Sequence, residues 1–213
     1  YITDQNVGYY GAQYGPHSGN NAGTGIYVRY PGNTWTNSLQ PGGFGFITII
    51  HELGHAMGLA HPHDSGGGST LFPGVTNSGS LGDNDLNQNS FTVMSYNDIN
   101  TGRNPSNAQA YGFCLGPEAF DIATIEYLYG LNPNFNSGTN TYTITEGTTP
   151  GVDGYACIYD TGNNDMIVYN GTKKVTIDLR PATIENNPGG GGYIRDRKST
   201  RLNSSHLVIS YAV

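Results

Sequence analysis

Three histidines and one glutamate stand close together in one segment, with a spacing that can bind a metal ion. The segment reads His51-Glu52-Leu53-Gly54-His55-Ala56-Met57-Gly58-Leu59-Ala60-His61. On a helix His51 and His55 are about one turn apart, so both imidazoles project from one face and can bind the same ion. Glu52 lies beside them, where its carboxylate can reach a water on the ion rather than the ion itself.

Gly58 and His61 extend this pair to three ligands. A glycine can adopt the positive φ that ends a helix and folds the chain back, which returns His61 toward the ion. Three neutral nitrogens plus an open position are the coordination of catalytic zinc, whereas structural zinc sites are closed by four ligands. The alternative is a core helix with locally hydrogen-bonded histidines, which would be costly to desolvate.

The remaining histidines are His17, His63 and His206, which we interpret as surface or loop residues. His63 is close enough to His61 to be a rival ligand, but the spacing favours His61. The predicted zinc ligands are therefore His51, His55 and His61.

Two helices are predicted around this segment. Apolar residues at helical spacing (Phe46, Ile49, Ile50, Leu53 and Met57) predict a helix over residues 44–59, which Pro62 prevents from continuing. A second helix is predicted over residues 117–129, with Pro117 at the first helical position and Gly130 at the stop. Residues 62–90 are predicted to form a long loop, and residues 91–96 a short apolar run near a tight turn.

Strands are predicted where apolar and polar residues alternate between Gly and Asn turns. These segments are residues 25–30, 141–145, 166–169 and 175–179. The fold class is therefore α+β, with a helical unit followed by a β-rich unit from residue 131 onward.

Composition limits the classes of partner. The net charge is −7 with only 9 basic residues, which argues against nucleic-acid or anionic-membrane partners. The chain has 32 Gly, 16 Tyr and 12% charged residues, which is typical of a loop-rich extracellular protein and compatible with calcium binding. No transmembrane segment is predicted, because the most apolar stretch is interrupted by His51, Glu52 and His55. Cys114 and Cys157 could form one disulfide or remain two separate buried thiols.

The long histidine motif followed by a turn with Met resembles the serralysin-type metzincins, a group of secreted bacterial zinc metallopeptidases. Thr92-Val93-Met94-Ser95-Tyr96 matches their Met-turn, and residues 116–130 match the helix that closes their catalytic domain. Tyr30-Pro31-Gly32 resembles the segment upstream of the zinc helix. The resemblance covers roughly residues 20–194.

The resemblance implies a role for each site residue. Met94 would form a hydrophobic floor under the three imidazoles without being a ligand, and Tyr96 would be a distant additional zinc ligand that swings to hydrogen-bond the oxyanion. Ordinary core packing is the alternative for both. Zinc would polarise its water and the scissile carbonyl, while Glu52 takes the proton as general base and returns it to the leaving amine. The substrate is expected to lie extended along an edge strand, for which residues 27–30 are the candidate.

A calcium site is expected farther along the chain. Serralysin-like proteins hold structural calcium where the catalytic domain meets a β-roll, and the matching positions here are Asn136, Gly138, Asn140, Asp160, Gly162 and Asp165. Carboxylates and carbonyls in a Gly-Asn turn suit Ca²⁺, and a plain Asx-rich turn is the alternative. The tandem calcium-binding repeats of the family are absent, although residues 189–192 resemble the place where they begin.

The predicted domains follow from these matches. Residues 1–130 are interpreted as a partial, N-terminally truncated metzincin catalytic domain, and residues 131–194 as a β-rich unit that starts a β-roll. Residues 195–213 hold four of the 9 basic residues and are suspected to be a non-native tail, with a native basic tail as the alternative. About fifty residues precede the zinc helix, fewer than in the family, so the chain is expected to be incomplete at both ends.

The predicted function is that of a secreted, monomeric zinc endopeptidase acting on protein or peptide substrates. The alternative is a calcium-dependent surface or adhesion protein that carries a vestigial metzincin domain. Glu52 favours the enzyme, because zinc binding survives the loss of this residue and hydrolysis does not. A matrixin-like peptidase is a third option, against which the position of Tyr96 argues.

Overall fold

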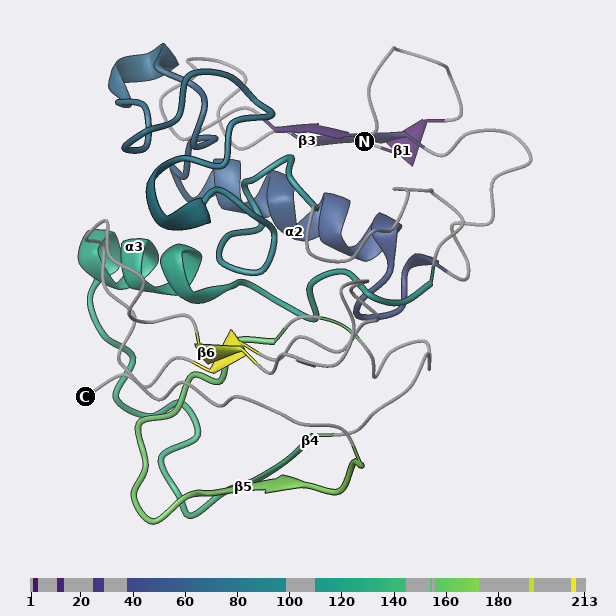
Figure 1. The fold of residues 1–213 in the computed structure, drawn as a ribbon, viewed down its shortest axis with the longest axis vertical. Coiled ribbons are helices and arrows are strands. Elements are labelled where there is room, and N and C mark those ends of the chain that lie inside the picture. Colours follow the sequence, from purple (N-terminus) through teal and green to yellow (C-terminus); the bar gives the residue numbers. More distant parts are fainter. Residues whose placement is uncertain are drawn as a thin grey trace.

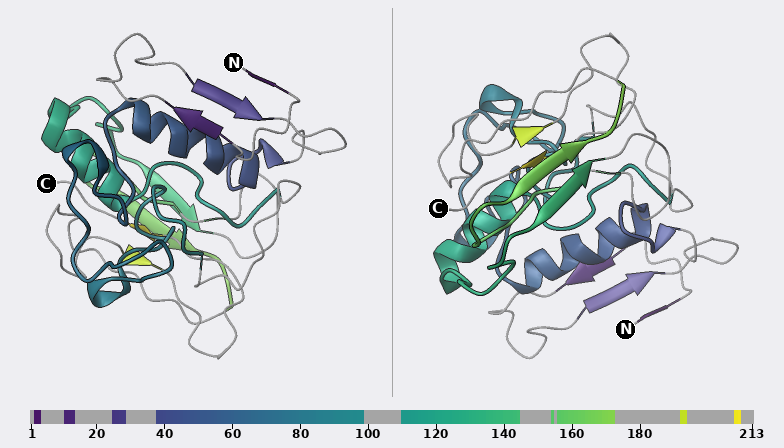
Figure 2. Two further views of the ribbon diagram at one scale, coloured as in Figure 1. Left: turned by 90° about the horizontal axis from the view of Figure 1, so that it is seen from above. Right: turned by 90° about the horizontal axis from the view of Figure 1, so that it is seen from below.

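The computed structural model describes residues 2–3, 11–13, 25–28, 38–98, 110–144, 154, 156–172, 192–193 and 208–209. Helix α2 (Phe44–Ala56) lies between a small sheet and helix α3 (Ala119–Tyr129), and a second sheet lies beyond α3 (Figure 1). Views from above and below show the first sheet along one side of α2, with α3 and the second sheet on the other side (Figure 2). Helices and strands occupy separate segments of the chain, as the α+β class predicts.

The first sheet has the strand order β1-β3-β2 and consists of β1 (Ile2–Thr3), β2 (Gly11–Gln13) and β3 (Gly25–Val28). Strand β3 pairs in parallel with β1 and antiparallel with β2. The strand predicted at residues 25–30 is confirmed over residues 25–28. The assignment of residues 27–30 as an edge strand for substrate is wrong at Tyr27, because β3 is the central strand and Tyr27 is paired with β1 on one side and β2 on the other. Residues 29–30 lie outside the described residues. Alternation predicts a strand but not its neighbours.

The second sheet is a parallel pair of β4 (Thr141–Ile144) and β5 (Met166–Tyr169), joined over four residues of each strand. These strands confirm the predictions at residues 141–145 and 166–169. A third sheet pairs β6 (Gly192–Tyr193) with β7 (Val208–Ile209) in antiparallel fashion. The strand predicted at residues 175–179 lies outside the described residues.

Helix α2 ends at Ala56, three residues before the predicted end, and Gly58 folds the chain back. Gly58 has a φ of +93°. Its N–H donates to the carbonyl of His55 at 3.0 Å, while the N–H of Leu59 donates to the carbonyl of Gly54 at 2.9 Å. This pair of bonds is the Schellman motif, which requires a left-handed residue that glycine adopts without strain. The predicted role of Gly58 is confirmed.

The buried face of α2 differs from the predicted apolar stripe. Ile47 and Gly54 are buried, whereas Leu53 and Met57 are 47% and 38% exposed. Residues 47, 51, 54 and 55 recur at helical spacing, so the face that carries the two histidines is the face that packs inward. The apolar residues alone predicted that a neighbouring face of α2 would be buried.

Helix α3 begins at Ala119 rather than at Pro117, and Glu118 has the extended backbone of an N-cap residue. The side chain of Asp121 accepts a hydrogen bond from the backbone N–H of Glu118 at 2.8 Å, which satisfies a donor at this helix end. Gly130, with a φ of +90°, ends the helix where the sequence predicts.

The hydrophobic core lies between the two helices and the loop that joins them. It contains Ile47, Leu59, Val93, Met94, Phe113 and Cys114, with Phe44, Ile50 and Ile125 packed against it. Cys114 and Cys157 are not joined by a disulfide. Among the described residues, no helix is long and apolar enough to cross a membrane.

Residues 62–90 form the predicted long loop, with 3₁₀ turns at η2 (Gly66–Gly68) and η3 (Asp83–Asp85). Buried asparagines organise the end of this loop. Asn89 donates from its side chain to the carbonyl of Ser95 at 2.7 Å, and Asn97 donates to the carbonyl of Asn87 at 3.0 Å. These bonds satisfy backbone groups that are buried outside regular secondary structure.

Candidate metal centre

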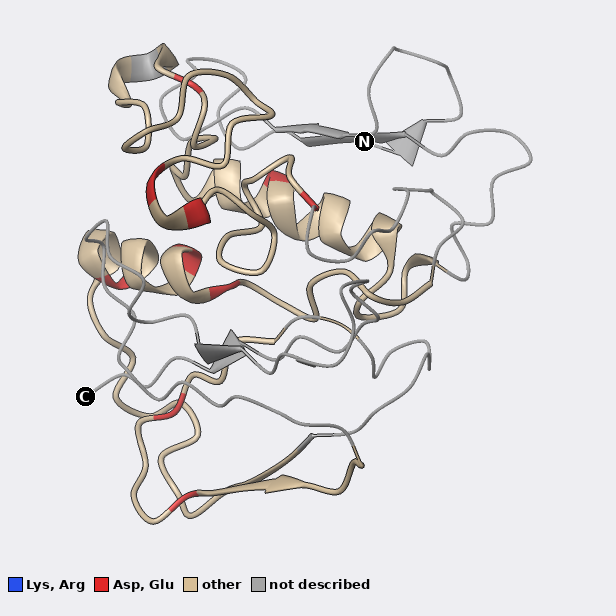
Figure 3. Ribbon diagram, in the orientation of Figure 1, with Lys and Arg blue, Asp and Glu red and all other residues tan. Residues whose placement is uncertain are grey.

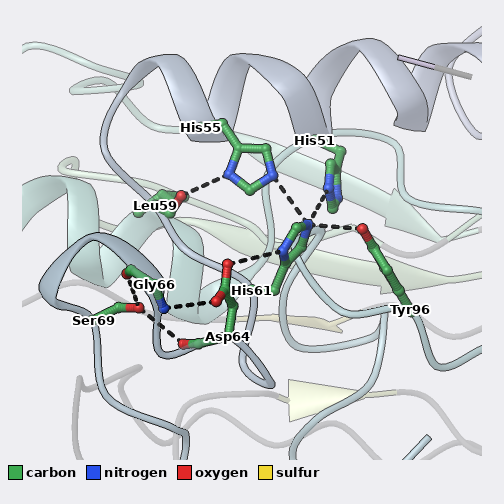
Figure 4. A network of polar contacts seen from close by, with 8 residues as sticks. All are labelled: His51, His55, Leu59, His61, Asp64, Gly66, Ser69 and Tyr96. Atoms are coloured by element: carbon green, nitrogen blue, oxygen red, sulfur yellow. Dashed lines mark hydrogen bonds and ion pairs between the residues drawn. The ribbon is translucent and has the colours of Figure 1, made fainter. Parts of the chain in front are cut away.

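The three predicted zinc ligands converge on one point. His51 and His55 project from α2, and His61 returns toward them after the Gly58 turn (Figure 4). The Nε2 atom of His61 lies 3.0 Å from Nε2 of His51 and 3.1 Å from Nε2 of His55. These three residues are the one group of His, Cys, Asp or Glu side chains in the described part of the chain with the spacing to hold a metal ion.

Two of these rings are held by main-chain carbonyls. Nδ1 of His51 lies 2.8 Å from the carbonyl oxygen of Val93, and Nδ1 of His55 lies 2.8 Å from that of Leu59. A carbonyl only accepts, so each Nδ1 carries the proton and each neutral ring keeps a lone pair on Nε2. Nε2 of His61 faces both of these lone pairs and carries at most one proton, so it can donate to only one of them, whereas a cation at this point would satisfy all three nitrogens.

Burial favours the neutral form of His51 and His61. It lowers the pKa of His51 to about 4, with a smaller opposing effect from the hydrogen bond to Val93. Burial, followed by the neighbouring histidines, lowers the pKa of His61 to about 3. Neutral imidazole is the form that binds metal.

The distances between the ring nitrogens fit zinc. Four-coordinate zinc binds imidazole nitrogen at about 2.0–2.1 Å, which places two ligand nitrogens about 3.3 Å apart. The observed separations of 3.0 and 3.1 Å are close to this value. Carbonyl partners on the second ring nitrogen are also what metal-bound histidines use to fix their orientation.

Glu52 and Tyr96 flank the three histidines. Glu52 follows the first ligand on α2 and is only 6% exposed. The hydroxyl of Tyr96 lies 3.0 Å from Nε2 of His61, which places it beside the same point (Figure 4). Burial and then the negative charges of Glu52 and Asp64 raise the pKa of Tyr96, so the phenol keeps its proton. The structure thus brings together every residue of the predicted zinc centre.

Met94 is a buried residue that packs against α2 at Gly54. Its side chain is 2% exposed. A Cβ at position 54 would lie 2.5 Å from the Sδ atom of Met94, so only glycine fits between the two histidine positions of the helix. The sequence did not reveal this requirement at Gly54, and the place of Met94 under the three imidazoles stays a prediction.

Asp121 is a further contributor that the sequence did not reveal. Its carboxylate accepts hydrogen bonds from the hydroxyl of Thr92 at 2.6 Å and from the backbone N–H of Val93 at 2.8 Å. Since the carbonyl of Val93 accepts from His51, Asp121 fixes the peptide segment that orients the first ligand. Burial raises the pKa of Asp121 to about 6, although its hydrogen bonds oppose this effect. From the sequence, an acidic residue at the start of a helix is interpreted as a local cap. Its contacts with residues 92–93, distant in the sequence, cannot be inferred in this way.

Comparison with known proteins gives the family. The chain is 34% identical to serralysin of Proteus mirabilis over 164 residues, which cover 71% of this chain. It is 30% identical over 204 residues, or 86% of this chain, to the metallopeptidase AprA of Pseudomonas marginalis. Serralysin C of Dickeya chrysanthemi is 34% identical over 176 residues, 76% of this chain. The chain belongs to the serralysin-type metzincins.

The serralysin relatives are much longer than the matched region. The alignments span 30%, 41% and 34% of these three proteins, so the chain corresponds to well under half of each. No family model matches the chain.

The serralysin-like region at residues 136–165 brings together the six predicted calcium residues. Asp160, 3% exposed, accepts from the backbone N–H of Gly162 at 2.6 Å through Oδ1. The side-chain amide of Asn140 donates to the carbonyls of Asn136 and Gly138 and to Oδ2 of Asp160, at 2.9, 3.2 and 3.1 Å. Oxygen atoms from three residues therefore surround the Asn140 amide.

Two further observations fit a cation at this place. The Oδ2 atom of Asp165 is buried without a hydrogen-bond partner, while Oδ1 accepts from the backbone N–H of Asn140 at 2.8 Å. Burial alone would raise the pKa of Asp160, but hydrogen bonds from Tyr142, Gly162 and Asn140 hold it below its usual value. The carboxylate of Asp160 is therefore ionised. Acidic positions colour the ribbon in this part of the molecule (Figure 3), where Asp160 and Asp165 both accept hydrogen bonds from Asn140.

Proposed function

We propose that the chain forms the zinc-binding part of a secreted endopeptidase that hydrolyses peptide bonds in protein substrates. The observation that carries the proposal is the convergence of three imidazole Nε2 atoms whose partner nitrogens point away, with Glu52 directly after the first ligand. Membership of the serralysin-type metzincins supports the same activity. The secreted location rests on this membership and on the low content of charged residues, 12% of the chain.

His51, His55 and His61 would hold the zinc ion. When bound, zinc supplies a Lewis acid and makes a water molecule acidic near neutral pH. Glu52 takes the proton from the attacking water and later delivers it to the leaving amine. The hydroxyl of Tyr96 donates a hydrogen bond to the oxyanion of the tetrahedral intermediate. Tyr96 is free to do so because its ring is 59% exposed and the raised pKa keeps its proton in place.

The test is casein hydrolysis by the purified chain, with and without a zinc chelator, beside two isosteric variants. Glu52→Gln removes the base, and Glu126→Gln on α3 is the matched control away from the three histidines. We expect Glu52→Gln to lose hydrolysis by at least about 100-fold while it binds one zinc per chain, because general base catalysis contributes about 10²–10⁴-fold. The Glu126→Gln control should cleave casein like the unmodified chain.

Failure of this test has a defined meaning. If the folded, zinc-loaded chain does not cleave casein, the peptidase proposal is wrong for this polypeptide. The alternative then gains, namely a calcium-dependent surface or adhesion protein in which the metzincin domain is vestigial. The oxygen-rich region around Asn140 is the observation that favours this alternative.

For the region after α3, we propose a structural calcium site at Asn136, Gly138, Asn140, Asp160, Gly162 and Asp165. The amide of Asn140 can rotate by 180° and present Oδ1 in place of Nδ2, since the two ends have the same shape. Carbonyls, an amide oxygen and carboxylates would then face one point, which is the ligand set that Ca²⁺ prefers. The parallel pairing of β4 and β5 agrees with a boundary near residue 130 and a β-roll start in residues 131–194.

The remaining proposals concern partners. We infer a monomer that recognises extended protein or peptide chains. The net charge of −7 supports the absence of a nucleic-acid partner, because phosphate binding requires clustered Lys and Arg.

A further inference from the structure

The third histidine of the centre is held differently from the other two. The rings of His51 and His55 are fixed by hydrogen bonds from Nδ1 to carbonyl oxygens, both at 2.8 Å. Nδ1 of His61 instead faces Oδ2 of Asp64 at 3.9 Å, which is too long for a hydrogen bond. Within the described residues, His61 therefore lacks the bond that orients the other two rings.

A local turn places His63 over the ring of His61. The backbone N–H of Asp64 donates to the carbonyl of His61 at 3.1 Å, which closes a four-residue turn over residues 61–64. Pro62 stands at the second position of this turn, where its fixed φ is favoured. The backbone N–H of Phe72 donates to the carbonyl of Pro62 at 2.9 Å and ties the turn to the loop that follows.

The turn brings the ring of His63 into contact with the rings of His61 and Tyr96. The rings of His61 and His63 are stacked, with centroids 4.9 Å apart and planes inclined by 15°. The ring of Tyr96 lies 4.7 Å from that of His63, so His63 touches both residues. Aromatic pairs with centroids about 4.5–7 Å apart attract one another beyond simple burial. Of these contacts, the stack is the one that restrains rotation of the His61 ring about its Cβ–Cγ bond.

We propose that His63 is a positioning residue for the third zinc ligand, acting through the face of its ring. Stacking keeps the plane of His61 fixed and Nε2 aimed at the point shared with His51 and His55. The carboxylate of Asp64 faces Nδ1 of His61 at 3.9 Å and attracts it electrostatically. This carboxylate is held in place by the backbone N–H of Gly66, which donates to it at 2.7 Å. This proposal rests on the proposed zinc site.

Stacking on His61 requires a flat ring at position 63, whereas metal binding by His63 would require a ring nitrogen. Substitutions can therefore distinguish the two roles. His63→Ala removes the ring, whereas His63→Phe keeps a flat ring without nitrogen. The readout is the rate at which the zinc-loaded chain releases zinc to a chromophoric chelator. We expect His63→Ala to release zinc about 10-fold faster, the effect typical of residues that orient metal ligands. His63→Phe should release zinc within about twofold of the unmodified rate.

Tyr127→Phe is the control, because it removes a hydroxyl from a side chain that is 74% exposed on α3; its release rate should equal that of the unmodified chain. Unchanged release from His63→Ala would overturn the proposal, as would His63→Phe releasing zinc as fast as His63→Ala. Complete loss of zinc from His63→Phe would make His63 a ligand instead. Circular dichroism of each variant establishes that it is folded. If the unmodified chain binds no zinc, the proposed function itself fails, which is a different result.

Discussion

Residues 51–61 and residues 136–165 both gather metal ligands, but they hold these ligands in opposite ways. In the first region two of the rings are bonded to main-chain carbonyls, and Met94, 2% exposed, packs against the same helix at Gly54. In the second region oxygens of Asn136, Gly138 and Asp160 converge on one side-chain amide, that of Asn140, in loops whose residues Asn136 and Gly138 are exposed.

The two regions differ in what supplies the free energy that orders their ligands. The zinc ligands are placed by the fold, so the ion can leave without moving the rings far. The oxygens around Asn140 repel one another unless an amide or a cation lies between them, so a calcium ion would itself order these loops. We therefore expect substitutions near the first region to change stability, and substitutions in the second to change the response to calcium.

Asp121→Asn gives the largest expected effect. The carboxylate of Asp121 accepts from Thr92, Val93 and Glu118, and the amide of asparagine would set a donor against one of these donors. We expect the free energy of unfolding to fall by about 3 kcal/mol. Urea denaturation followed by far-UV circular dichroism measures this.

Asp160→Asn is the matched change in the second region. Without calcium it should lower the free energy of unfolding by about 1 kcal/mol, because the amide retains one acceptor. If Asp121→Asn and Asp160→Asn lower the free energy of unfolding equally, the distinction between ligands placed by the fold and ligands ordered by the ion is wrong.

Gly54→Ala comes next. Alanine favours helices, yet its Cβ would lie 2.5 Å from Sδ of Met94, so we expect a net loss of about 2 kcal/mol from overpacking. Gly138→Ala is the control, since no atom lies within 4 Å of a Cβ there. Thermal unfolding of both variants compares them. A Gly54→Ala variant as stable as the unmodified chain would contradict the close packing of Met94.

The sequence predicted the ligands better than their supports. His51, His55 and His61 follow from spacing, and Gly58 follows from the need for a positive φ, since both depend only on local geometry. Asp121 and Gly54 act through contacts with residues 92–94, which are distant in the sequence. A single sequence contains no signal that pairs Asp121 or Gly54 with residues 92–94.

The misplaced features have similar causes. The exposed positions of Leu53 and Met57 arise because the histidine face must turn inward, which hydrophobicity does not record. Strand β3 was predicted by alternation, but its central position depends on β1 and β2. Pro117 is compatible with a first helical position, yet the extended backbone of Glu118 decides where α3 starts.

Calcium binding gives a smaller expected change. At a calcium concentration ten times its Kd, the free energy of unfolding should rise by about 1.4 kcal/mol. Differential scanning calorimetry with and without calcium measures the shift, and Asp160→Asn should abolish it. A shift that persists in Asp160→Asn would place the ion elsewhere.

The pH dependence of zinc binding gives the smallest effect. Protons compete with zinc for each ring, but burial lowers the pKa of His51 to about 4 and that of His61 to about 3. Between pH 7.5 and 5.5 these two rings stay neutral, so the apparent affinity should fall with a slope of at most one proton per zinc. Competition with a chelator of known affinity measures the slope. A slope near three would show ordinary, solvent-exposed histidines.

Zinc K-edge X-ray absorption of the zinc-loaded chain tests whether three histidines hold the ion. We expect three imidazole nitrogens at about 2.0–2.1 Å, an oxygen in the remaining position and no sulfur. A sulfur ligand at about 2.3 Å, or fewer than three imidazoles, would contradict a centre built from His51, His55 and His61.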